Sequence, residues 1–591
     1  MSQKLENQLN LALDTPESMR AETQNLNVGF DADTRTWELI VRYHRDPEIL
    51  KSDRVIAEPL LAGYAIVTVP ENMVTAVMAD PGVEYVEKPK NFYYGAEVPS
   101  ARSCLAEVIA GEPFLSGKGV LVAVLDSGIA YRRAEFRKAD GGTRIRCLWD
   151  QTLTGGGLPG PPAGFLQGAE FSEERINRAL SALSVEEGFS LVPSIDATGH
   201  GTAVAGIAAA GRTETYRGIA AQADLLIVKL GGGTKEDDLA GFTKTTEIMR
   251  AITYAIRKAQ DFEMPLVINL SYGNTYGAHD GSSLLESFLD LAAQIGRTCI
   301  FVGSGNEGNS SGHIGGDIRK RRSADLVIAE YERNLSVQIW KQYTDAFRVL
   351  LRAPGGGSVA LMPQSGSGGG YIQQLEGTEL LVYYGEPSPY SLDQEIYLEM
   401  LPAGGRSFLT SGIWRFTLEP VRITAGRYDF YLPPAVVRND GTGFLEASPE
   451  KTVTIPGTAK KAITVGAYDP VYEAYADFSG RGTGGFSEDG RIPLAFVKPD
   501  VAAPGIGILA PDAFGGYVSV SGTSFAVPIV SGSAALLMEW GIVRGNDPYL
   551  YGEKMKAYLR AGAQPLRGEE LYPNGKVGFG AVCAAISLPG Y

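Results

Sequence analysis

Three short segments of the chain carry residue types that together could perform acyl transfer. Asp126 ends the apolar run Val122–Leu125, His200 lies in a Gly-His-Gly-Thr turn, and Ser524 lies in a Ser-Gly-Thr-Ser turn. A serine hydroxyl is a weak nucleophile until a base takes its proton, and the base needs a carboxylate to fix its tautomer and stabilise its cation. The three residues therefore predict an orienting acid, a general base and a nucleophile, in the order Asp, His, Ser.

Ser524 is expected where a strand meets a helix. The residues Val518–Val520 alternate in polarity, and the residues after Ser524 are mostly small and apolar. Thr523 and Ser524 are favourable N-cap types, and Pro528 is tolerated in the first turn of a helix. Backbone N–H groups at such a terminus point at an anion, so Ser524 could carry a donor for an oxyanion on its own backbone. Taken alone, the segment fits a capped and tightly packed helix equally well.

The three segments resemble the active-site motifs of the subtilisin-like serine proteases, whose catalytic residues follow the same order. The resemblance runs from Asp126 to Leu537, with interruptions. It implies a serine endopeptidase in which Ser524 attacks the peptide, His200 acts as base and then as acid, and Asp126 orients His200. It also implies that Asn306, in a Gly-Ser-Gly-Asn-Glu-Gly segment, completes the oxyanion hole. From the residues alone, Asn306 could instead occupy a left-handed turn.

Two further segments match family segments that flank the substrate backbone and the pocket for the residue before the cleavage site. They are Leu270, Ser271, Tyr272 and Gly273, and Gly303, Ser304 and Gly305. Open main-chain edges at such positions bind an extended peptide as an added strand. The partners implied are a protein or peptide substrate and the chain's own N-terminal propeptide.

Composition limits the alternatives. The chain of 591 residues predicts two to four domains. Its formal net charge of −15 and pI near 5.0 argue against a general nucleic-acid or anionic-membrane surface. Four widely spaced cysteines show no metal-ligand spacing, and Cys299, within an apolar run, is expected to be a small core residue. The N-terminus lacks the apolar core of a signal peptide, so a cytoplasmic or spore-associated location is expected, with no cofactor.

From residue 118 onward the pattern predicts an α/β fold with a parallel sheet flanked by helices. Continuous apolar runs fit strands that are buried on both faces. These runs are Val120–Leu125, Leu225–Leu230, Leu266–Leu270, Thr298–Val302 and Ile463–Ala467. A segment between Asp126 and His200 contains a Gly/Pro-rich stretch and an amphipathic helix at Glu173–Leu183. We expect this insertion to decorate the rim of the cleft.

The N-terminal region predicts a small α+β unit. Strands bracket short helices between residues about 34 and 90, as in a ferredoxin-like fold. The unit resembles the propeptide of subtilisin-like proteases, although an N-terminal domain without that role fits the pattern too. The resemblance implies self-cleavage near Tyr94–Ala96, within the window Tyr93–Arg102.

Residues 313–455 interrupt the family pattern with short alternating strands and Gly/Pro/Ser turns. This pattern predicts a β-sandwich, with a jelly roll as the preferred form. The insertion resembles that of the clostridial germination-specific Csp proteases, which implies activation of another protein by limited proteolysis. A structural or substrate-positioning role is favoured over carbohydrate binding. The expected organisation is a propeptide-like domain at 1–95, a catalytic domain at 96–312 and 456–591, and the sandwich at 313–455.

Residues 211–218, after the predicted His200 helix, lack the asparagine-rich character of the family's strong calcium loop. Arg212 and Arg217 oppose a cation there, so no metal site is predicted. Two other classes of function compete with an endopeptidase. Some Csp members have lost catalytic residues, which leaves a pseudoprotease or regulatory binding protein open; a carbohydrate-binding structural protein would explain the sandwich but not the triad. All four catalytic positions are retained in this chain, which favours the enzyme.

Overall fold

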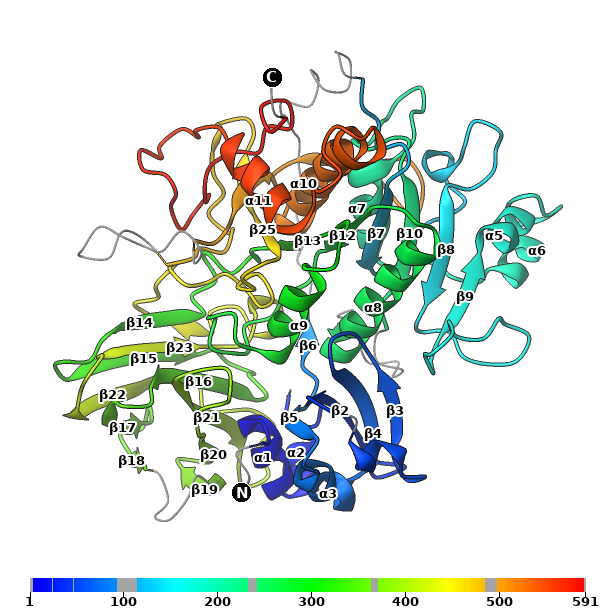
Figure 1. The fold of residues 1–591 in the computed structure, drawn as a ribbon. Coiled ribbons are helices and arrows are strands. Elements are labelled where there is room, and N and C mark those ends of the chain that lie inside the picture. The colour runs from blue at the N-terminus through cyan, green and yellow to red at the C-terminus, as the bar shows by residue number, and fades with distance from the viewer. Residues whose placement is uncertain are drawn as a thin grey trace. The chain divides into compact units, whose positions relative to one another are not determined.

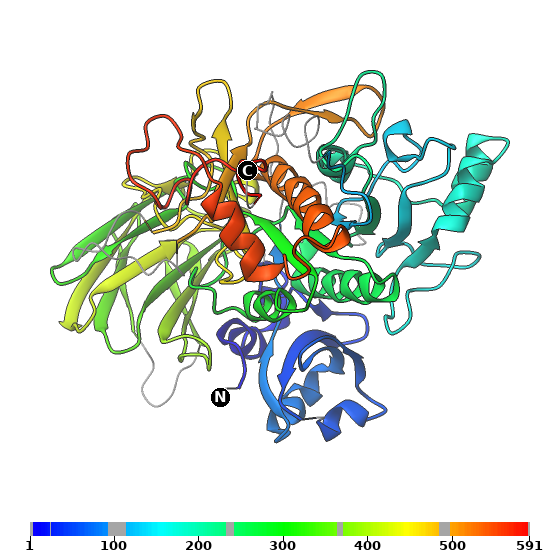
Figure 2. The same cartoon turned by 45° about the horizontal axis from the view of Figure 1, so that its top comes forward.

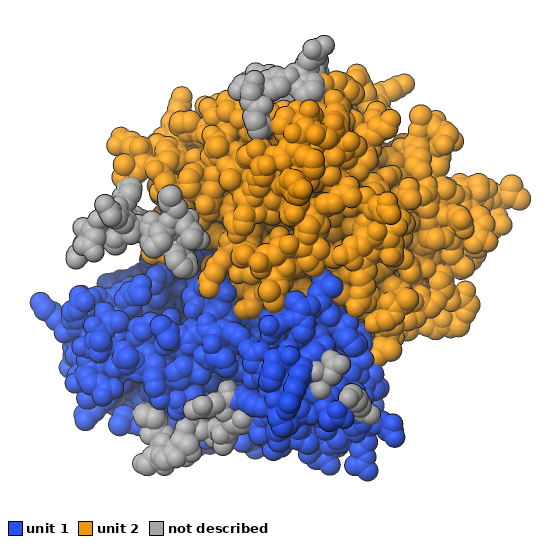
Figure 3. Space-filling view, in the orientation of Figure 1, with its two compact units in different colours: residues 1–91, 274–284, 307–455 blue, residues 92–273, 285–306, 456–591 orange. Residues whose placement is uncertain are grey.

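The computed structural model describes residues 4–23, 25–45, 47–92, 114–231, 242–362, 370–483 and 497–588. The chain divides into two compact units (Figure 3). Unit 1 comprises residues 1–91, 274–284 and 307–455, and unit 2 comprises residues 92–273, 285–306 and 456–591. The N-terminal region and the inserted strands therefore belong to one unit, and the segments with Asp126, His200 and Ser524 belong to the other. The domain boundaries expected from the sequence stay predictions.

Unit 2 is built on a nine-stranded sheet in the order β26-β25-β13-β12-β7-β10-β8-β9, with β27 beside β25. Seven strands are parallel, whereas β9 and β26 are antiparallel to their neighbours. The strands are β7 (Leu121–Asp126), β8 (Ile145–Asp150), β9 (Ala169–Ser172), β10 (Asp224–Lys229), β12 (Leu266–Leu270), β13 (Thr298–Gly303), β25 (Ile463–Asp469), β26 (Ala474–Tyr475) and β27 (Val501–Pro504). All five predicted strands are confirmed, and Cys299 is buried on β13 as expected.

Helices cover both faces of this sheet. On one face α7 packs against α10, and on the other α8 and α9 lie below the strands in Figure 1. The helices are α5 (Glu173–Leu180), α6 (Val185–Leu191), α7 (His200–Ala209), α8 (Thr245–Asp261), α9 (Leu284–Ala292), α10 (Thr523–Met538) and α11 (Gly552–Ala561). A short strand, β11 (Thr243–Lys244), precedes α8, and the hairpin β28 (Ile508–Pro511) and β29 (Tyr517–Val520) precedes α10. Burial on both faces explains the continuous apolar runs in the strands.

One helix in the described part of the chain is long and apolar enough to cross a membrane, namely Thr523–Val543 with a mean hydropathy of 1.6. Its apolar window is 83% buried within the protein. Every residue of α10 is buried. A helix that is apolar all round and enclosed by protein is a core helix, and its composition follows from that position.

The insertion between Asp126 and His200 was expected only to decorate the cleft rim, and this expectation is wrong for its first part. Strand β8 pairs in parallel with β10, and β9 extends the sheet further. Trp149 on β8 is fully buried, and its ring lies 5.0 Å from that of Tyr254. Arg146 interrupts the apolar run of β8, so the sequence did not mark this segment as a buried strand.

Two predicted helices differ in detail from the structure, α5 at its end and α10 at its start. The helix expected at Glu173–Leu183 is observed as α5, and the Ser172 hydroxyl caps it by accepting a 3.3 Å hydrogen bond from the third helical N–H. Helix α10 has Gly522 as its N-cap, with φ at 136°. Thr523 and Ser524, expected as cap residues, are the first two residues of the helix itself. Only glycine adopts such a φ without strain, so Gly522 sets the direction in which Ser524 leaves the strand.

The N-terminal part of unit 1 forms a five-stranded antiparallel sheet. Its strands are β1 (Phe30–Asp31), β2 (Thr36–Tyr43), β3 (Ile56–Pro59), β4 (Tyr64–Pro70) and β5 (Val83–Glu87), followed by β6 (Asn91–Phe92). The helices are α1 (Asn7–Asp14), α2 (Glu17–Arg20) and α3 (Val74–Ala79), with a 3₁₀ turn at Glu48–Lys51. The order β5-β2-β4-β3, with a helical segment after β2 and after β4, is the order expected of a ferredoxin-like unit.

The remaining strands of unit 1 form two antiparallel sheets around one apolar core (Figure 2). One sheet has the order β14-β23-β16-β21-β20-β19 and the other β18-β17-β22-β15-β24. The strands are β14 (His313–Asp317), β15 (Arg322–Ile328), β16 (Leu335–Gln342), β17 (Ala346–Arg352), β18 (Ser358–Leu361), β19 (Gly370–Leu375), β20 (Thr378–Tyr384), β21 (Asp393–Pro402), β22 (Gly412–Arg422), β23 (Arg427–Tyr431) and β24 (Gly443–Phe444). Two such sheets form a β-sandwich, whereas the jelly-roll topology stays a prediction.

The N-terminal region and the sandwich share a second apolar core within unit 1. Leu9 of α1 packs in one cluster with Leu381 of β20 and Tyr397 of β21. A buried polar contact lies beside this core: the Gln8 amide donates to Glu395 Oε1 at 3.3 Å. No pattern in the sequence indicated that these two regions would fold against each other.

Two carboxyl groups are buried on β21 beside this shared core. Burial raises the pKa of Glu395 and of Glu399 to about 7. The Tyr397 hydroxyl donates to Glu399 Oε2 at 2.6 Å, whereas Glu399 Oε1 has no hydrogen-bond partner among the described residues. As the pH rises, the Glu399 carboxyl ionises in the unfolded chain at its ordinary pKa near 4.5, whereas in the folded chain it ionises only near 7. Each group therefore lowers the stability of the fold progressively between about pH 4.5 and 7.

We predict that Glu399→Gln stabilises the protein more at pH 8 than at pH 5. The amide keeps an acceptor for Tyr397 and removes the cost of ionising a buried carboxyl, roughly 1–3 kcal/mol at pH 8. Urea unfolding at both pH values measures the difference, with Glu330→Gln at an exposed position as the control. Equal gains at the two pH values would contradict the raised pKa.

Candidate active site

Asp126 is the last residue of β7, and His200 is the first residue of α7. His200 Nδ1 lies 2.6 Å from Asp126 Oδ1, and the two side chains are only 2% and 1% exposed. The Ser127 N–H also donates to Asp126 Oδ1, at 2.7 Å. A buried carboxylate in this position holds the Nδ1–H tautomer of the imidazole and fixes the orientation of the ring. The structure thus brings the predicted acid and base together as the sequence indicated.

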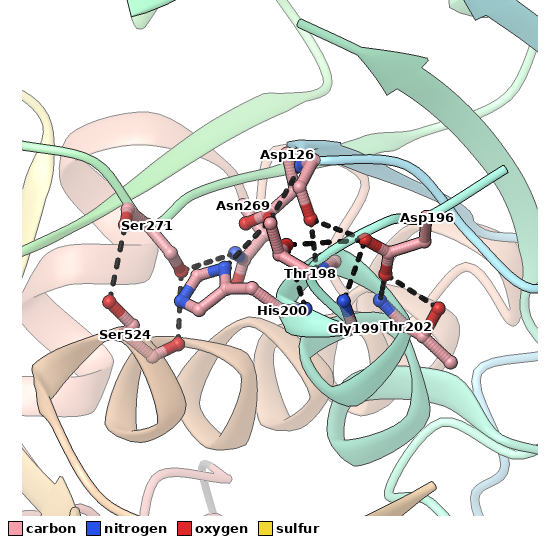
Figure 4. A network of polar contacts seen from close by, with 11 residues as sticks. Asp126, Asp196, Thr198, Gly199, His200, Thr202, Asn269, Ser271 and Ser524 are labelled. Carbon is pink, nitrogen blue, oxygen red and sulfur yellow. Dashed lines mark hydrogen bonds and ion pairs between the residues drawn. The ribbon is translucent and has the colours of Figure 1, made fainter. Parts of the chain in front are cut away.

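Ser524 is the second residue of α10 and is 5% exposed. Its hydroxyl donates to the Ser271 carbonyl at 3.2 Å, and the Ser271 hydroxyl donates to the Ser524 carbonyl at 3.0 Å. Figure 4 shows Ser524 and Asp126 on opposite sides of the His200 ring. A hydroxyl carries one proton, so the O–H bond of Ser524 must turn away from the Ser271 carbonyl before it can donate to His200. The ring of His200 packs against Phe525, with centroids 5.2 Å apart.

Asn306 follows β13 and is held by the first residue of α10. Its Oδ1 accepts the Thr523 N–H and the Thr523 hydroxyl, both at 3.0 Å. The carbonyl end of the amide is therefore directed to Thr523, and the NH₂ end lies on the opposite side of the amide group. The left-handed residue of this turn is Gly305, with φ at 84°, so the alternative in which Asn306 itself takes that conformation is wrong.

The two predicted substrate segments lie at the ends of neighbouring parallel strands. Leu270 ends β12 and Gly303 ends β13, so both segments reach the same edge of the sheet as Asp126. Leu270 and Ser304 are fully buried, and the Ser304 N–H pairs with the Val465 carbonyl at 2.9 Å. Their side chains therefore support this edge from inside. The remaining predicted residues, Ser271, Tyr272, Gly273 and Gly305, belong to the segments that directly follow the two strands.

Asp196 is a residue of this site that the sequence reasoning missed. Its Oδ1 accepts the Ser127 hydroxyl at 2.8 Å and the Gly199 N–H at 2.9 Å, and its Oδ2 accepts the Thr202 N–H and hydroxyl at 2.8 and 2.7 Å. These bonds tie the strand end that carries Asp126 to the helix start that carries His200. A carboxylate four residues before His200, at a turn into a helix, was the available signal.

Asn269 is a second missed residue. It is fully buried on β12, where its Nδ2 donates to the Ser271 hydroxyl at 3.0 Å and its Oδ1 accepts the Ser531 hydroxyl at 2.9 Å. Because the Ser271 hydroxyl in turn donates to the Ser524 carbonyl, this chain of bonds links β12 to two turns of α10. A polar residue within an otherwise apolar strand marked the position.

The segment after α7 shows no feature of a cation site. The Thr213 N–H bonds to the Tyr216 carbonyl at 2.8 Å, and the ring of Tyr216 stacks on that of Tyr517 with centroids 5.2 Å apart. Throughout the described residues, no group of three or more His, Cys, Asp or Glu residues is placed to hold a metal ion. The expected absence of a tight calcium site stays a prediction.

Comparisons with known proteins agree with this geometry. The Csp protease B prodomain family matches residues 3–90, and the Subtilase family matches residues 117–378 and 439–580. The solved structure of the CspB protease of Clostridium perfringens is 34% identical with a TM-score of 0.73, covering 82% of this chain and 95% of that chain. The chain therefore belongs to the subtilase family, and the prodomain match together with the likeness to CspB places it with the Csp-type proteases.

Two curated relatives from Bacillus subtilis (strain 168) are more distant. The minor extracellular protease Vpr is 23% identical over 79% of this chain, and the serine protease AprX is 33% identical over 24% of it. The chain spans about half the length of Vpr, 51%, and the aligned part is 32% of AprX. These partial similarities are consistent with membership of the subtilase family.

We predict that Asp196→Asn slows labelling by a fluorophosphonate about 10–100-fold. The amide has the shape of the carboxylate, but its NH₂ group replaces an oxygen that accepts hydrogen bonds. Because this NH₂ group would face other donors, the turn before His200 must shift. The labelling rate under saturating and subsaturating probe measures the effect. Asp140→Asn, which alters an exposed carboxylate that accepts the Gly142 N–H, is the control. A rate equal to that of the wild type would show that Asp196 does not position the site.

Proposed function

We propose that the protein is a serine endopeptidase that hydrolyses peptide bonds through Asp126, His200 and Ser524. The observation that carries the proposal is the 2.6 Å bond between two buried groups, Asp126 and His200, beside a serine at the N-terminus of a buried helix. Membership of the subtilase family supports the same reading.

In the proposed mechanism, the Ser524 hydroxyl turns from the Ser271 carbonyl to His200, which takes its proton as the oxygen attacks the scissile carbonyl. Asp126 stabilises the imidazolium that forms, and His200 then protonates the leaving amine. Water repeats the sequence on the acyl-enzyme, and Ser524 regains its proton. No metal or cofactor is required for these steps.

The oxyanion would be bound by the Ser524 N–H and the Asn306 amide. The bonds from Thr523 to Asn306 Oδ1 support this role, because they direct the NH₂ end of the amide away from α10's first residue. Donors held in place before the reaction need not reorganise as charge develops, and one such donor contributes about 3–4 kcal/mol to the transition state. The backbone at 271–273 and 303–305 would bind the extended substrate.

The N-terminal region is proposed to be a propeptide that the enzyme cuts from itself. The match of residues 3–90 to the Csp protease B prodomain supports this proposal. The expected cleavage window, Tyr93–Arg102, lies outside the described residues. Limited proteolysis of another protein is the proposed downstream role, and the sandwich is proposed to be a jelly roll with a structural or substrate-positioning function.

We predict that Ser524→Ala, His200→Ala and Asp126→Ala each lower turnover by roughly 10⁴–10⁶-fold, and that the triple variant loses little more than the worst single variant. Residues that act as one unit are strongly non-additive. Turnover of a fluorogenic peptide measures this, and a fluorophosphonate should label the wild type but not Ser524→Ala. Ser519→Ala, four residues before α10, is the matched serine control. Undiminished turnover in Ser524→Ala, or a wild type that neither turns over nor labels, would favour the pseudoprotease alternative.

Self-cleavage is tested by the intact mass of the purified chain. The wild type should give two fragments, whose masses place a single cut within Tyr93–Arg102. Ser524→Ala should give one uncut chain. Ser519→Ala should be cut like the wild type. If the wild type digests peptides but remains one chain, the N-terminal region is not a self-processed propeptide.

A further inference from the structure

Unit 2 contains a cavity of about 480 Å³ beside the candidate active site. Its walls are residues 129–133 after β7, Phe189 of α6, residues 194–197 before α7, and residues 513–515 at the tip of the β28–β29 hairpin. We call it the Phe514 pocket. Its volume falls within the range of about 300–1,000 Å³ that is typical of ligand pockets. None of the proposed catalytic steps uses it.

The lining of the Phe514 pocket is largely apolar and partly exposed. Phe514 is 78% exposed, Ile195 50% and Phe189 36%, although each is large and apolar. Single exposed apolar side chains are ordinary, whereas three around one concave surface indicate a binding site. Phe189 comes from the insertion between Asp126 and His200, for which the sequence offered no function.

Most polar groups in the lining are already engaged. The Ser194 hydroxyl donates to Asp150 at 2.6 Å, and Arg133 bonds to both oxygens of Glu135. Arg132 donates to the Ala179 carbonyl at 2.9 Å, and no ion pair joins it to a carboxylate among the described residues. The lining also contains the carboxylate of Asp196, whose two oxygens already accept hydrogen bonds from Ser127, Gly199 and Thr202. The pocket therefore offers a ligand apolar contact and, at its edge, the positive charge of Arg132, which suits an apolar group with a carboxylate beside it.

The Phe514 pocket continues the candidate active site past His200. Asp196 lines the pocket and also accepts the Gly199 N–H, next to His200. A Cβ added to Gly199 would lie 3.6 Å from Cβ of Ala513 at the hairpin tip. In Figure 4, Ser524 and Asp196 lie on opposite sides of His200. A group bound in the pocket is thus separated from Ser524 by the histidine.

The position of the Phe514 pocket corresponds to the part of a bound peptide that follows the scissile bond. In the proposed function, residues before the scissile bond lie along 271–273, on the Ser271 side of Ser524. His200 must protonate the departing amine, so the residues after the scissile bond continue on the His200 side. An extended chain spans about 10 Å in three residues, which allows side chains a few positions after the cut to reach past His200.

We propose that the Phe514 pocket binds apolar side chains of the substrate that lie about three to six residues after the scissile bond, with an acidic residue beside them at Arg132. This inference rests on the proposed peptidase function and specifies the class of its substrate. Substrate selection would then depend on a segment that is released with the amine product.

Two fluorogenic peptides test the proposal with the full chain. They share all residues up to the second position after the scissile bond; positions three to six are Phe-Leu-Asp-Phe in one peptide and Ser-Gly-Ser-Gly in the other. The wild type should show a kcat/KM ratio of about tenfold in favour of the first, mainly through KM. In Phe514→Ser this ratio should fall toward one. Leu509→Ser, at a 48% exposed position of β28 outside the pocket, should keep it.

A binding measurement separates this inference from the peptidase function. Fluorescein-labelled fragments that begin after the scissile bond, with either tail, are titrated against Ser524→Ala and Ser524→Ala/Phe514→Ser, and anisotropy gives Kd. The apolar, acidic tail should bind about tenfold more weakly to the double variant, whether or not the wild type cleaves peptides. Because Phe514 lies at an exposed hairpin tip, its substitution should leave the melting temperature unchanged, and Ile195→Ser serves as a second variant. Equal Kd values for both tails and both proteins would overturn the proposal.

Discussion

The bond between Asp126 and His200 joins the end of a strand of the parallel sheet, β7, to the start of a helix that packs on that strand, α7. Parallel strands end at one edge, and the functional side chains of such folds lie in the loops at that edge. Asp126 ends β7, the 271–273 turn follows β12, and Asn306 follows β13. Asp196 fixes the position of the His200 turn relative to the end of β7, because it accepts hydrogen bonds from both the Ser127 hydroxyl and the Gly199 N–H. A shift of β7 relative to α7 would move the acid relative to the base.

Ser524 is positioned by a different means, since α10 is buried along its whole length and carries no charged residue. Its register against β12 is set by a few buried polar bonds, including that from Ser531 to Asn269. Apolar packing alone tolerates small slides and rotations, whereas a hydrogen bond in a low-dielectric core has a defined direction. Asn269 and Ser531 thereby specify where the helix begins relative to the strand.

The sequence predicted the local elements well and their combination less well. The apolar runs at β7, β10, β12, β13 and β25 identified the central strands because both faces of the sheet are covered. β8 was missed because Arg146 breaks its run, and Gly522 was missed as the N-cap because Ser and Thr beside it are better known in that role. Asp196 acts through backbone donors of a turn, and Leu381 meets Leu9 across more than 370 positions of chain. Neither relation leaves a periodic pattern in a single sequence.

The core that the N-terminal region shares with the sandwich makes the two parts dependent on each other for solubility. Leu381 and Tyr397 are at most 1% exposed only because residues such as Leu9 cover them. A chain that began after residue 92 would present this apolar face to water, together with the carboxyl of Glu395, which would lose its contact with Gln8. Such a surface promotes association with other chains. In the intact chain, the first ninety residues therefore serve as the cover of an apolar face of the sandwich.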